Sequence, residues 1–155
     1  MEMEPYFTTL CSQIVGLSVR NRRLAGNTLI VYVECSPGDK SGYVLCLEPT
    51  WHMCDSQGVV AGSRQAQEEE PEEPGEPTGF EMVADQIDNL VGKRIEQIDR
   101  DARTGDLTVQ LEGGYLLRTF VCDPREERLW YIRDGQTKQT IHGDPKGLRV
   151  TARGT

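Results

Sequence analysis

The residues best able to support chemistry stand together in Trp51-His52-Met53-Cys54, where a histidine and a thiol are two positions apart. Residues two apart on a strand share one face, so His52 and Cys54 could contribute two ligands to one metal ion. A structural zinc site usually contains two close ligand pairs, and no second pair accompanies this one. We therefore interpret the pair as a buried thiol beside a surface histidine, and expect neither a metal nor a cofactor.

Nucleophilic catalysis requires a cysteine or serine with a positioned base, and the only histidines are His52 and His142. The chain contains no Gly-x-Ser-x-Gly elbow and no glycine-rich phosphate loop. Acidic pairs such as Asp99 and Asp101 fall in turn or strand-end contexts, where solvated charge is their ordinary role. We therefore expect no catalytic residues and predict that the protein is not an enzyme.

Most of the net charge of −8 comes from one segment. Residues 65–79 contain six glutamates, three prolines and no basic residue. This composition cannot bury enough apolar surface to become ordered, which predicts a disordered acidic linker. The alternative is an acidic tether that engages a cationic partner. The flanking segments, residues 1–64 and 80–155, are each close to electroneutral.

The basic residues, the hydropathy and the cysteines limit the partners and the cellular location that we expect. Arg20-Asn21-Arg22-Arg23 is a local basic cluster, but no basic stripe with interleaved aromatic residues accompanies it. We interpret the cluster as a solvated strand end and expect no nucleic-acid partner. No apolar run is long enough to cross a bilayer, and the acidic start is unlike a secretory signal. The five scattered cysteines fit no disulfide framework, so we expect a cytoplasmic protein with reduced thiols and no membrane partner.

The two segments that flank the linker repeat one pattern, in which the apolar blocks match and the insertions fall in turn-like or charged stretches. The matched blocks are Val15-Gly16 with Val91-Gly92, Leu29 with Leu107, Gly42-Tyr43 with Gly114-Tyr115, and Trp51 with Trp130. We therefore predict two tandem pseudo-symmetric repeats, residues 1–64 and 80–155. A repeat of about 65 residues is marginal for an independent core, so we expect the two to share one.

The periodicity predicts the elements of each repeat. Apolar residues follow helical spacing from Tyr6 to Val15 and from Met82 to Val91, with a glycine after each segment. Alternating apolar and polar residues then predict strands, most clearly in 107–112. Each repeat is thus a short helix followed by an antiparallel β-meander, in a strand-dominated α+β fold. Trp51 and Trp130 are expected at the seam between helix and sheet. The relative packing of the repeats and the oligomeric state stay open.

Several of these blocks also resemble a known group of proteins. The two Val-Gly starts, the strand and hairpin of 106–114, the stretch from Trp51 to Ser63, and Trp130 resemble a family of small uncharacterised bacterial proteins. Some members look like immunity proteins of polymorphic toxin systems. The resemblance implies a non-enzymatic cytoplasmic protein that binds and blocks a partner toxin. This chain departs from the simplest form of that idea, because its acidity lies in the linker.

Two functional hypotheses follow. The first is a protein-binding module that uses strand edges or loops differing between the repeats. Its interface residues would be Asp39 and Lys40 in the 36–41 loop, and Arg125, Glu126 and Glu127 in the 123–127 loop.

The second hypothesis is a small-ligand-binding or regulatory domain that uses the cleft between the repeats. A pocket lined by Trp51, His52 and Cys54 would favour this hypothesis, whereas a solid seam would favour protein binding.

Overall fold

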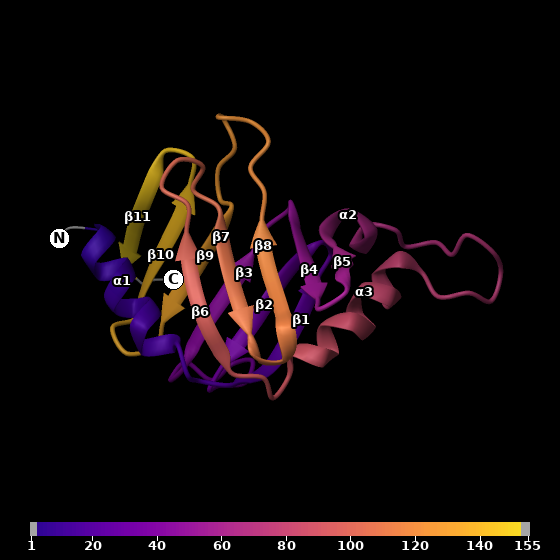
Figure 1. Ribbon diagram of the computed structural model, residues 1–155, viewed down its shortest axis with the longest axis horizontal. Helices are drawn as coiled ribbons and strands as arrows, with labels where there is room; N and C mark the ends of the chain where they lie inside the picture. The colour runs from indigo at the N-terminus through magenta and orange to yellow at the C-terminus, as the bar shows by residue number, and fades with distance from the viewer. Residues whose placement is uncertain (1–2, 153–155) are drawn as a thin grey trace.

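Two antiparallel β-sheets pack against each other in residues 3–152, the part of the chain that the computed structural model describes (Figure 1). The six-stranded sheet has the order β1-β2-β3-β9-β10-β11. Its strands are β1 (Val19–Ala25), β2 (Thr28–Val33), β3 (Tyr43–Leu47), β9 (Trp130–Asp134), β10 (Gln139–Asp144) and β11 (Gly147–Ala152). The five-stranded sheet has the order β5-β4-β8-β7-β6. Its strands are β4 (Trp51–Asp55), β5 (Gly58–Gly62), β6 (Ile95–Arg100), β7 (Leu107–Leu111) and β8 (Tyr115–Thr119).

The helices flank the two sheets. They are α1 (Met3–Ile14), α2 (Ser63–Ala66) and α3 (Gly79–Ile87), with short 3-10 turns η1 (Asp88–Leu90) and η2 (Glu112–Gly114). Figure 1 shows α1 at one side of the sheets and α2 with α3 at the other. α3 begins with a capping box, in which Thr78 and Glu81 bond each other's backbone N–H groups. Both predicted helices are thus confirmed, and the chain has the predicted strand-dominated α+β class.

The connection after the third strand of each half differs from the predicted meander. Residues 48–50 carry the chain from β3 into the other sheet, where β4 pairs with β8. In the second half, β9 leaves β8 and pairs with β3, so that Leu47 lies opposite Trp130. The prediction of an unbroken meander in each half is therefore wrong. Hydrophobic alternation determines which face of a strand is buried, but it does not select the neighbouring strand.

Three strands lie outside the predicted pattern. β1 and β6 precede the first predicted strand of each half, and β11 follows the last one. β1 contains Arg20, Arg22 and Arg23, so its apolar alternation is weak. Just before β1 and β6 begin, an isolated bridge pairs Ser18 with Arg94. The two sheets are therefore joined at this point as well as through the core.

A large apolar cluster fills the space between the sheets and includes side chains from both halves of the chain. Trp51 and Trp130 are 1% and 0% exposed, and both belong to this cluster. The Trp130 ring lies 5.5 Å from the Phe7 ring of α1, centroid to centroid, which places it at a helix–sheet seam. The Trp51 indole N–H donates to the Asn27 carbonyl at 2.8 Å. Both tryptophans therefore position strands within the core.

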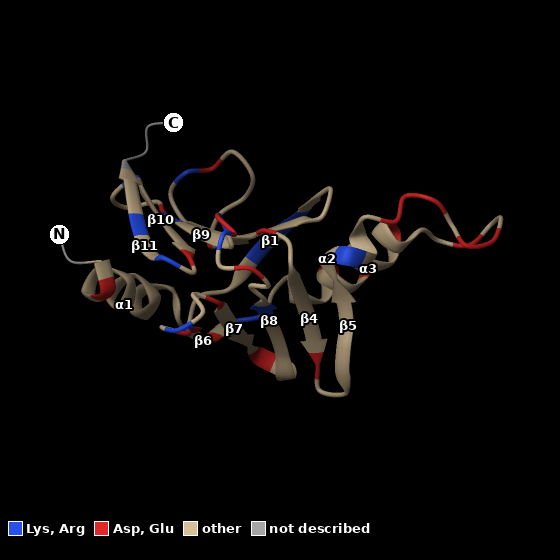
Figure 2. Ribbon diagram, turned by 90° about the horizontal axis from the view of Figure 1, so that it is seen from above, with Lys and Arg blue, Asp and Glu red and all other residues tan. Residues whose placement is uncertain are grey.

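The acidic segment forms an extended loop that projects away from the sheets (Figure 2). Its predicted boundary at residue 65 falls inside α2, where Ala66 is buried. The loop is closed at its base, because the Phe80 N–H donates to the Glu68 carbonyl at 3.0 Å. The segment without helix or strand is therefore 67–78, slightly shorter than the predicted linker.

Candidate functional site

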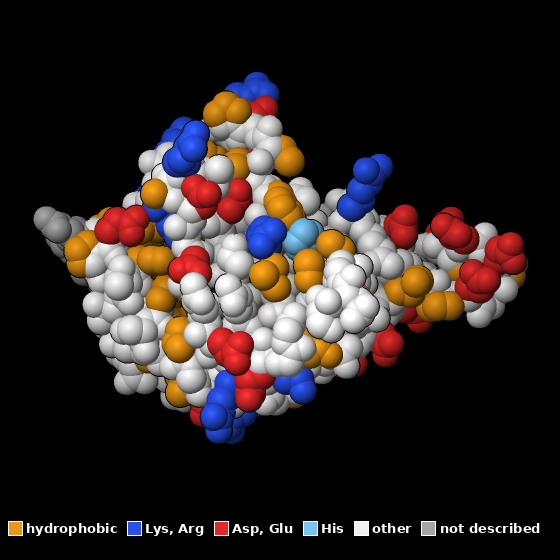
Figure 3. Space-filling view, viewed as in Figure 1, with side chains coloured by type: hydrophobic (Ala, Val, Ile, Leu, Met, Phe, Trp, Pro, Cys, Tyr) orange, Lys and Arg blue, Asp and Glu red, His pale blue; other side chains and the backbone are white. Residues whose placement is uncertain are grey.

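The residues expected to form a ligand pocket lie on opposite faces of β4. The Trp51 side chain points into the core, whereas His52 is half-buried on the outer face of the five-stranded sheet. Figure 3 shows that this outer face carries hydrophobic side chains among charged ones. Because Trp51 cannot reach a ligand that contacts His52, the structure does not bring the predicted pocket together.

His52 itself packs against an aromatic ring. The centroids of the His52 and Phe120 rings lie 4.4 Å apart in an edge-on arrangement. Burial, and then the nearby Arg118 guanidinium, lower the pKa of His52, so the neutral imidazole is favoured. Its Nε2 atom has no hydrogen-bond partner among the described residues. Within residues 3–152, no group of three or more histidine, cysteine or acidic side chains could hold a metal ion, so no third ligand of these types accompanies His52 and Cys54.

The 36–41 loop is held by hydrogen bonds within itself and to the turn after β9. The Asp39 carboxylate accepts from the Ser41 N–H at 3.0 Å and from the Ser41 hydroxyl at 2.8 Å. The Lys40 carbonyl accepts from the Lys138 ammonium at 3.3 Å. The exposed side chains of Asp39 and Lys40 therefore lie beside the β9–β10 turn.

The 123–127 loop projects from the other end of the six-stranded sheet, as the register of β3 with β9 shows. Arg125 is 88% exposed in its side chain and makes two hydrogen bonds to the Asp123 carboxylate. A Glu126 carboxylate oxygen accepts from the Cys122 N–H at 3.2 Å, and Glu127 is exposed. The two predicted interface loops are therefore separated by the length of the strands, and they do not form one continuous surface.

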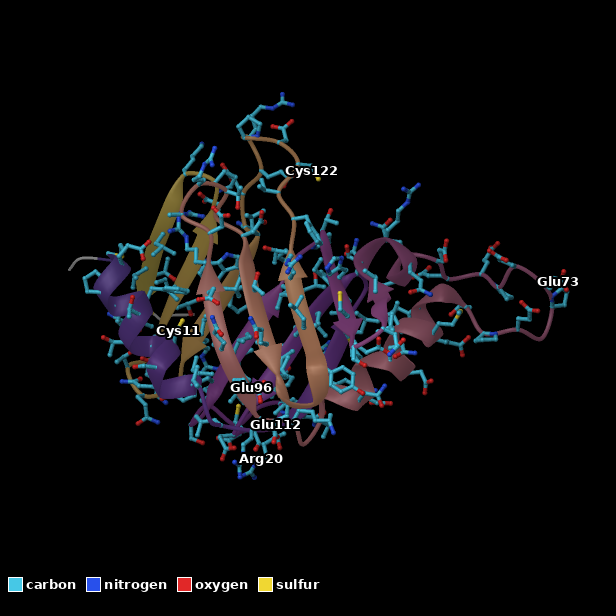
Figure 4. The ribbon with its side chains drawn as sticks, in the orientation of Figure 1. Cys11, Arg20, Glu73, Glu96, Glu112 and Cys122 are labelled. Atoms are coloured by element: carbon cyan, nitrogen blue, oxygen red, sulfur yellow. The ribbon has the colours of Figure 1, made fainter. Side chains whose placement is uncertain are left out.

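A groove that the sequence did not predict runs between α1 and the edge strand β6, with a volume of about 380 Å³. On the helix side it is lined by the face of α1 that contains Phe7 and Cys11, and by Val15, which follows the helix. On the other side it is lined by every residue in 96–100 of β6. Figure 4 shows Cys11 on the side of α1 that faces β6, and Glu96 near the lower end of that strand. The groove thus joins a helix face to the edge of β6 along 96–100, beyond Ile95, whose N–H and C=O already bond Leu17 and Gly16.

The edge of β6 gives this groove its capacity to bind a peptide. β6 is the last strand of its sheet, and β7 is its only partner along 97–100. In an antiparallel pair, alternate residues of an edge strand direct their N–H and C=O groups away from the partner strand. An extended peptide can satisfy those groups by adding a strand. The groove therefore presents main-chain donors and acceptors as well as side chains.

The rim of the groove is acidic, with Glu4, Glu96 and Asp99 around a single arginine. The Arg100 side chain is 7% exposed and donates from Nη1 to Glu4 at 2.7 Å. Its Nε atom is buried without a hydrogen-bond partner in the described part of the chain. A buried N–H group without an acceptor destabilises the protein. A ligand that brings an acceptor to the Arg100 Nε–H would therefore bind more favourably.

The Cys11 thiol in the groove is held in its protonated form. Burial, and then the negative charges of Asp99 and Glu4, raise the pKa of Cys11 to about 12. A thiol with such a pKa is protonated at neutral pH, and the nucleophilic form is the thiolate. Cys11 therefore contributes an apolar surface to the groove. The groove has no local sequence signal, because α1 and β6 are about eighty residues apart in the chain.

No family model, curated protein or solved structure matches this chain. The helices within residues 3–152 are also too short and too polar to cross a bilayer. Function is therefore inferred from the groove, its charge and the edge strand beside it.

Proposed function

We propose that the chain is a non-enzymatic protein-binding module that receives an extended, basic segment of its partner in the groove between α1 and β6. The observation that carries this proposal is the participation of every residue from 96 to 100 in the groove lining. The partner segment would add as a strand to the edge of β6, beside α1. Main-chain hydrogen bonds would supply affinity in this arrangement, and the side chains on the rim would supply specificity.

The charge of the rim indicates which segments fit. Glu96 and Asp99 are exposed on β6 and have no described arginine or lysine within ion-pairing distance, so they can pair with lysine or arginine of the partner. A carbonyl of the added strand would be an acceptor for the unpaired Nε of Arg100 if the guanidinium turns toward it. Complementary charge favours rapid encounter and the correct register of the strand.

A toxin blocked by an immunity protein is one such partner, and a cytoplasmic role of this kind stays a prediction based on the family resemblance. A toxin that acts on nucleic acid carries basic segments, which the acidic rim would attract. Co-expression with a candidate toxin tests this narrower idea. Rescue of the cells and co-purification of the two proteins are expected, and failure of both would overturn the toxin role.

The architecture behind the groove is, in our proposal, an internal duplication whose halves exchange strands. The two sheets support it, because β1-β2-β3-β9-β10 and β6-β7-β8-β4-β5 have the same order once the halves are interchanged. The two indole N–H groups also make equivalent bonds, Trp51 to the Asn27 carbonyl and Trp130 to the Gly105 carbonyl, each at 2.8 Å.

Reciprocal backbone contacts at the junction of β1 and β6 support the same proposal. The Gly16 N–H donates to the Ile95 carbonyl at 2.7 Å, and the Gly92 N–H donates to the Val19 carbonyl at 2.8 Å. Each contact becomes the other when the halves are interchanged. Under this proposal, α1 and α3 are equivalent helices, each packed near the edge strand of the opposite half. On the α1 side, the space beside the edge strand β6 is a groove with an acidic rim.

A designed peptide tests the groove directly. We would titrate the protein with a peptide of alternating lysine and valine and follow backbone amide signals by NMR. The expected result is a shift and slower hydrogen exchange for amides in β6, because strand addition gives them new hydrogen-bond acceptors. A peptide of alternating glutamate and valine is the charge control, and proline at alternate positions of the lysine peptide is the strand-pairing control.

Matched variants assign the binding to the groove. Replacing Glu96 and Asp99 together by lysine is expected to abolish binding of the lysine peptide. The control replaces Glu72 and Glu73 by lysine. These residues lie on the projecting loop, so the charge change is the same but distant from the groove, and binding should stay nearly intact. An equal loss of peptide affinity in both double variants would show that the peptide responds to net charge alone. NMR signals of β6 amides that do not change on adding the lysine peptide would overturn the proposed site.

A further inference from the structure

The outer face of the six-stranded sheet carries a basic and aromatic surface that is separate from the groove. Alternate residues of each central strand belong to the large core cluster, so Leu45, Ile132 and Ile141 point into that core. Their neighbours in the chain point to the opposite side. The strand register then shows which of these outward side chains lie next to each other.

The register forms two adjacent rows across all six strands. The first row, from β1 to β11, is Arg23, Ile30, Cys46, Tyr131, His142 and Arg149. The second row is Asn21, Tyr32, Val44, Arg133, Thr140 and Thr151. We call these twelve residues the outer rows. They contain three arginines and no acidic residue, in a chain whose net charge is −8.

The arginines span the whole width of the sheet. Arg23 is exposed on β1, Arg149 is exposed on β11, and Arg133 is half-buried near the centre. With strands about 4.8 Å apart, the two outer arginines are separated by about 24 Å. Arg149 is paired with Asp144 at 3.1 Å, whereas neither Arg23 nor Arg133 has an ion-pair partner among the described residues. Arg133 and Arg23 therefore offer unpaired positive charge at the centre and at one edge, although Glu48 lies close to Tyr131 and Cys46.

Aromatic rings lie between these charges. The Tyr131 and His142 rings are neighbours, with centroids 5.9 Å apart. Burial, and then the guanidinium groups of Arg149 and Arg128, lower the pKa of His142, so its ring is neutral at physiological pH. Tyr32 lies in the second row beside Val44 and is 8% exposed. Tyr131 and His142 are thus the half-buried rings between the arginines, and Tyr32, Val44 and Cys46, at most 8% exposed, support them from below.

We propose that the outer rows bind single-stranded nucleic acid. Exposed bases stack on aromatic rings irrespective of sequence, and arginines contact the phosphates along the strand. The pairing of half-buried rings with arginines favours this ligand over an acidic peptide, which has charge but no planar groups to stack. It also favours a single strand over a duplex, in which the bases already stack on each other.

This proposal reverses the expectation drawn from the sequence, in which no basic stripe with interleaved aromatic residues was visible. The twelve residues come from six strands between Asn21 and Thr151. The sheet, and not the order of the chain, brings them into two rows. The site is also independent of the groove, which lies between α1 and the other sheet.

Fluorescence anisotropy with labelled oligonucleotides tests the proposal on the full chain. We expect a mixed-sequence single strand of twelve nucleotides to bind at 50 mM salt more tightly than the corresponding duplex. With three phosphate contacts, affinity should fall about 20-fold between 50 and 200 mM salt. The variant Tyr131→Leu should weaken binding about 5- to 150-fold through the loss of one stacking platform.

Charge variants place the binding on the face. The double variant Arg23→Glu and Arg133→Glu is expected to abolish binding. Arg103→Glu reverses an exposed charge in the turn between β6 and β7 of the other sheet, and should lower affinity only slightly. Thermal unfolding of each variant shows whether it is folded, and only folded variants are compared.

Three results would overturn the proposal. They are no binding of the single strand at 50 mM salt, equal weakening by the Arg103 variant, and equally tight binding of a decaglutamate peptide. The last result would instead identify the outer rows as a surface for acidic protein segments. None of these outcomes bears on the groove, because the lysine peptide would still bind there.

Discussion

The Trp130 indole lies directly against the backbone of Gly143, so closely that a β-carbon at position 143 would collide with its ring. The two residues face each other in the register of β9 with β10. Glycine is therefore the residue that allows a large aromatic side chain to lie flat beside a neighbouring strand.

The contact predicts that two glycine-to-alanine variants differ strongly in their free energy of unfolding. Gly143→Ala should lower the free energy of unfolding by about 1–3 kcal/mol or more, because the ring has no space into which to move. Gly62→Ala is the matched control, since a β-carbon there would lie 3.5 Å from the Trp51 carbonyl, an ordinary contact. Urea denaturation measures both, and equal losses would contradict the steric argument.

The indole hydrogen bonds predict a cost for removing either N–H group. Trp51→Phe and Trp130→Phe should each destabilise the protein by about 1–3 kcal/mol, because each leaves a carbonyl without its donor and shortens a buried side chain. Similar values are expected, since the two bonds have the same length. Chemical denaturation of both variants checks this, and a negligible cost at one position would show that the two contacts are not equivalent.

Cleavage of the projecting loop should leave the two halves associated. Each sheet contains strands from both halves, so neither half can complete a sheet alone. A protease site placed between Glu72 and Glu73 should give two fragments that elute together and unfold in one transition. Two separately folded fragments would contradict the exchange of strands between the halves.

The thiols should differ sharply in reactivity. Cys122 is exposed, whereas burial raises the pKa of Cys11 and of Cys46 to about 12 in each case. A thiol reagent at pH 7.5 should modify Cys122 rapidly, and Cys11 and Cys46 only when the protein unfolds. The Cys122→Ser variant should lose the rapid phase. Rapid modification that persists in this variant would contradict the assignment.

The histidines predict a loss of stability in mildly acidic solution. The pKa values of His52 and His142 are lowered in the folded protein, mainly by burial, so protonation favours the unfolded chain. Their contribution is complete above a pH of about 6.5, the ordinary histidine pKa, and declines as the pH falls below it. Urea denaturation at pH 7.5 and 5.5 should show the decrease. The double variant His52→Gln and His142→Gln should show a smaller decrease, and an unchanged one would exclude the histidines as its source.

Local patterns predicted the local elements and little beyond them. The spacing of Phe7, Leu10 and Ile14 indicates α1, and the alternation of Leu107, Val109 and Leu111 indicates β7. Both signals arise from a single face packing on the core, which a short window of sequence records. The pairing of β3 with β9 has no such signal, because several strands share the same alternation.

The candidate sites were hidden for the same reason. His52 and Cys54 stand out in the sequence, yet residues 3–152 provide no third ligand beside them, and Trp51 lies on the other face of their strand. The groove contains Cys11 and Arg100, and the outer rows contain Arg23 and Arg149, which no motif connects. A site formed by strands that are distant in the chain can be recognised only when the strand order is known.

The exchange of strands between the sheets also has a consequence for biosynthesis. A ribosome releases the chain from its N-terminus, and β3 emerges long before its neighbour β9. Throughout that interval β3, whose five side chains are all buried in the folded protein, lacks its partner β9, and β4 lacks β8. Such distant pairings slow folding and expose the nascent chain to aggregation. The acidic segment emerges in the middle of this interval, so its negative charge would keep neighbouring nascent chains apart until the second half arrives.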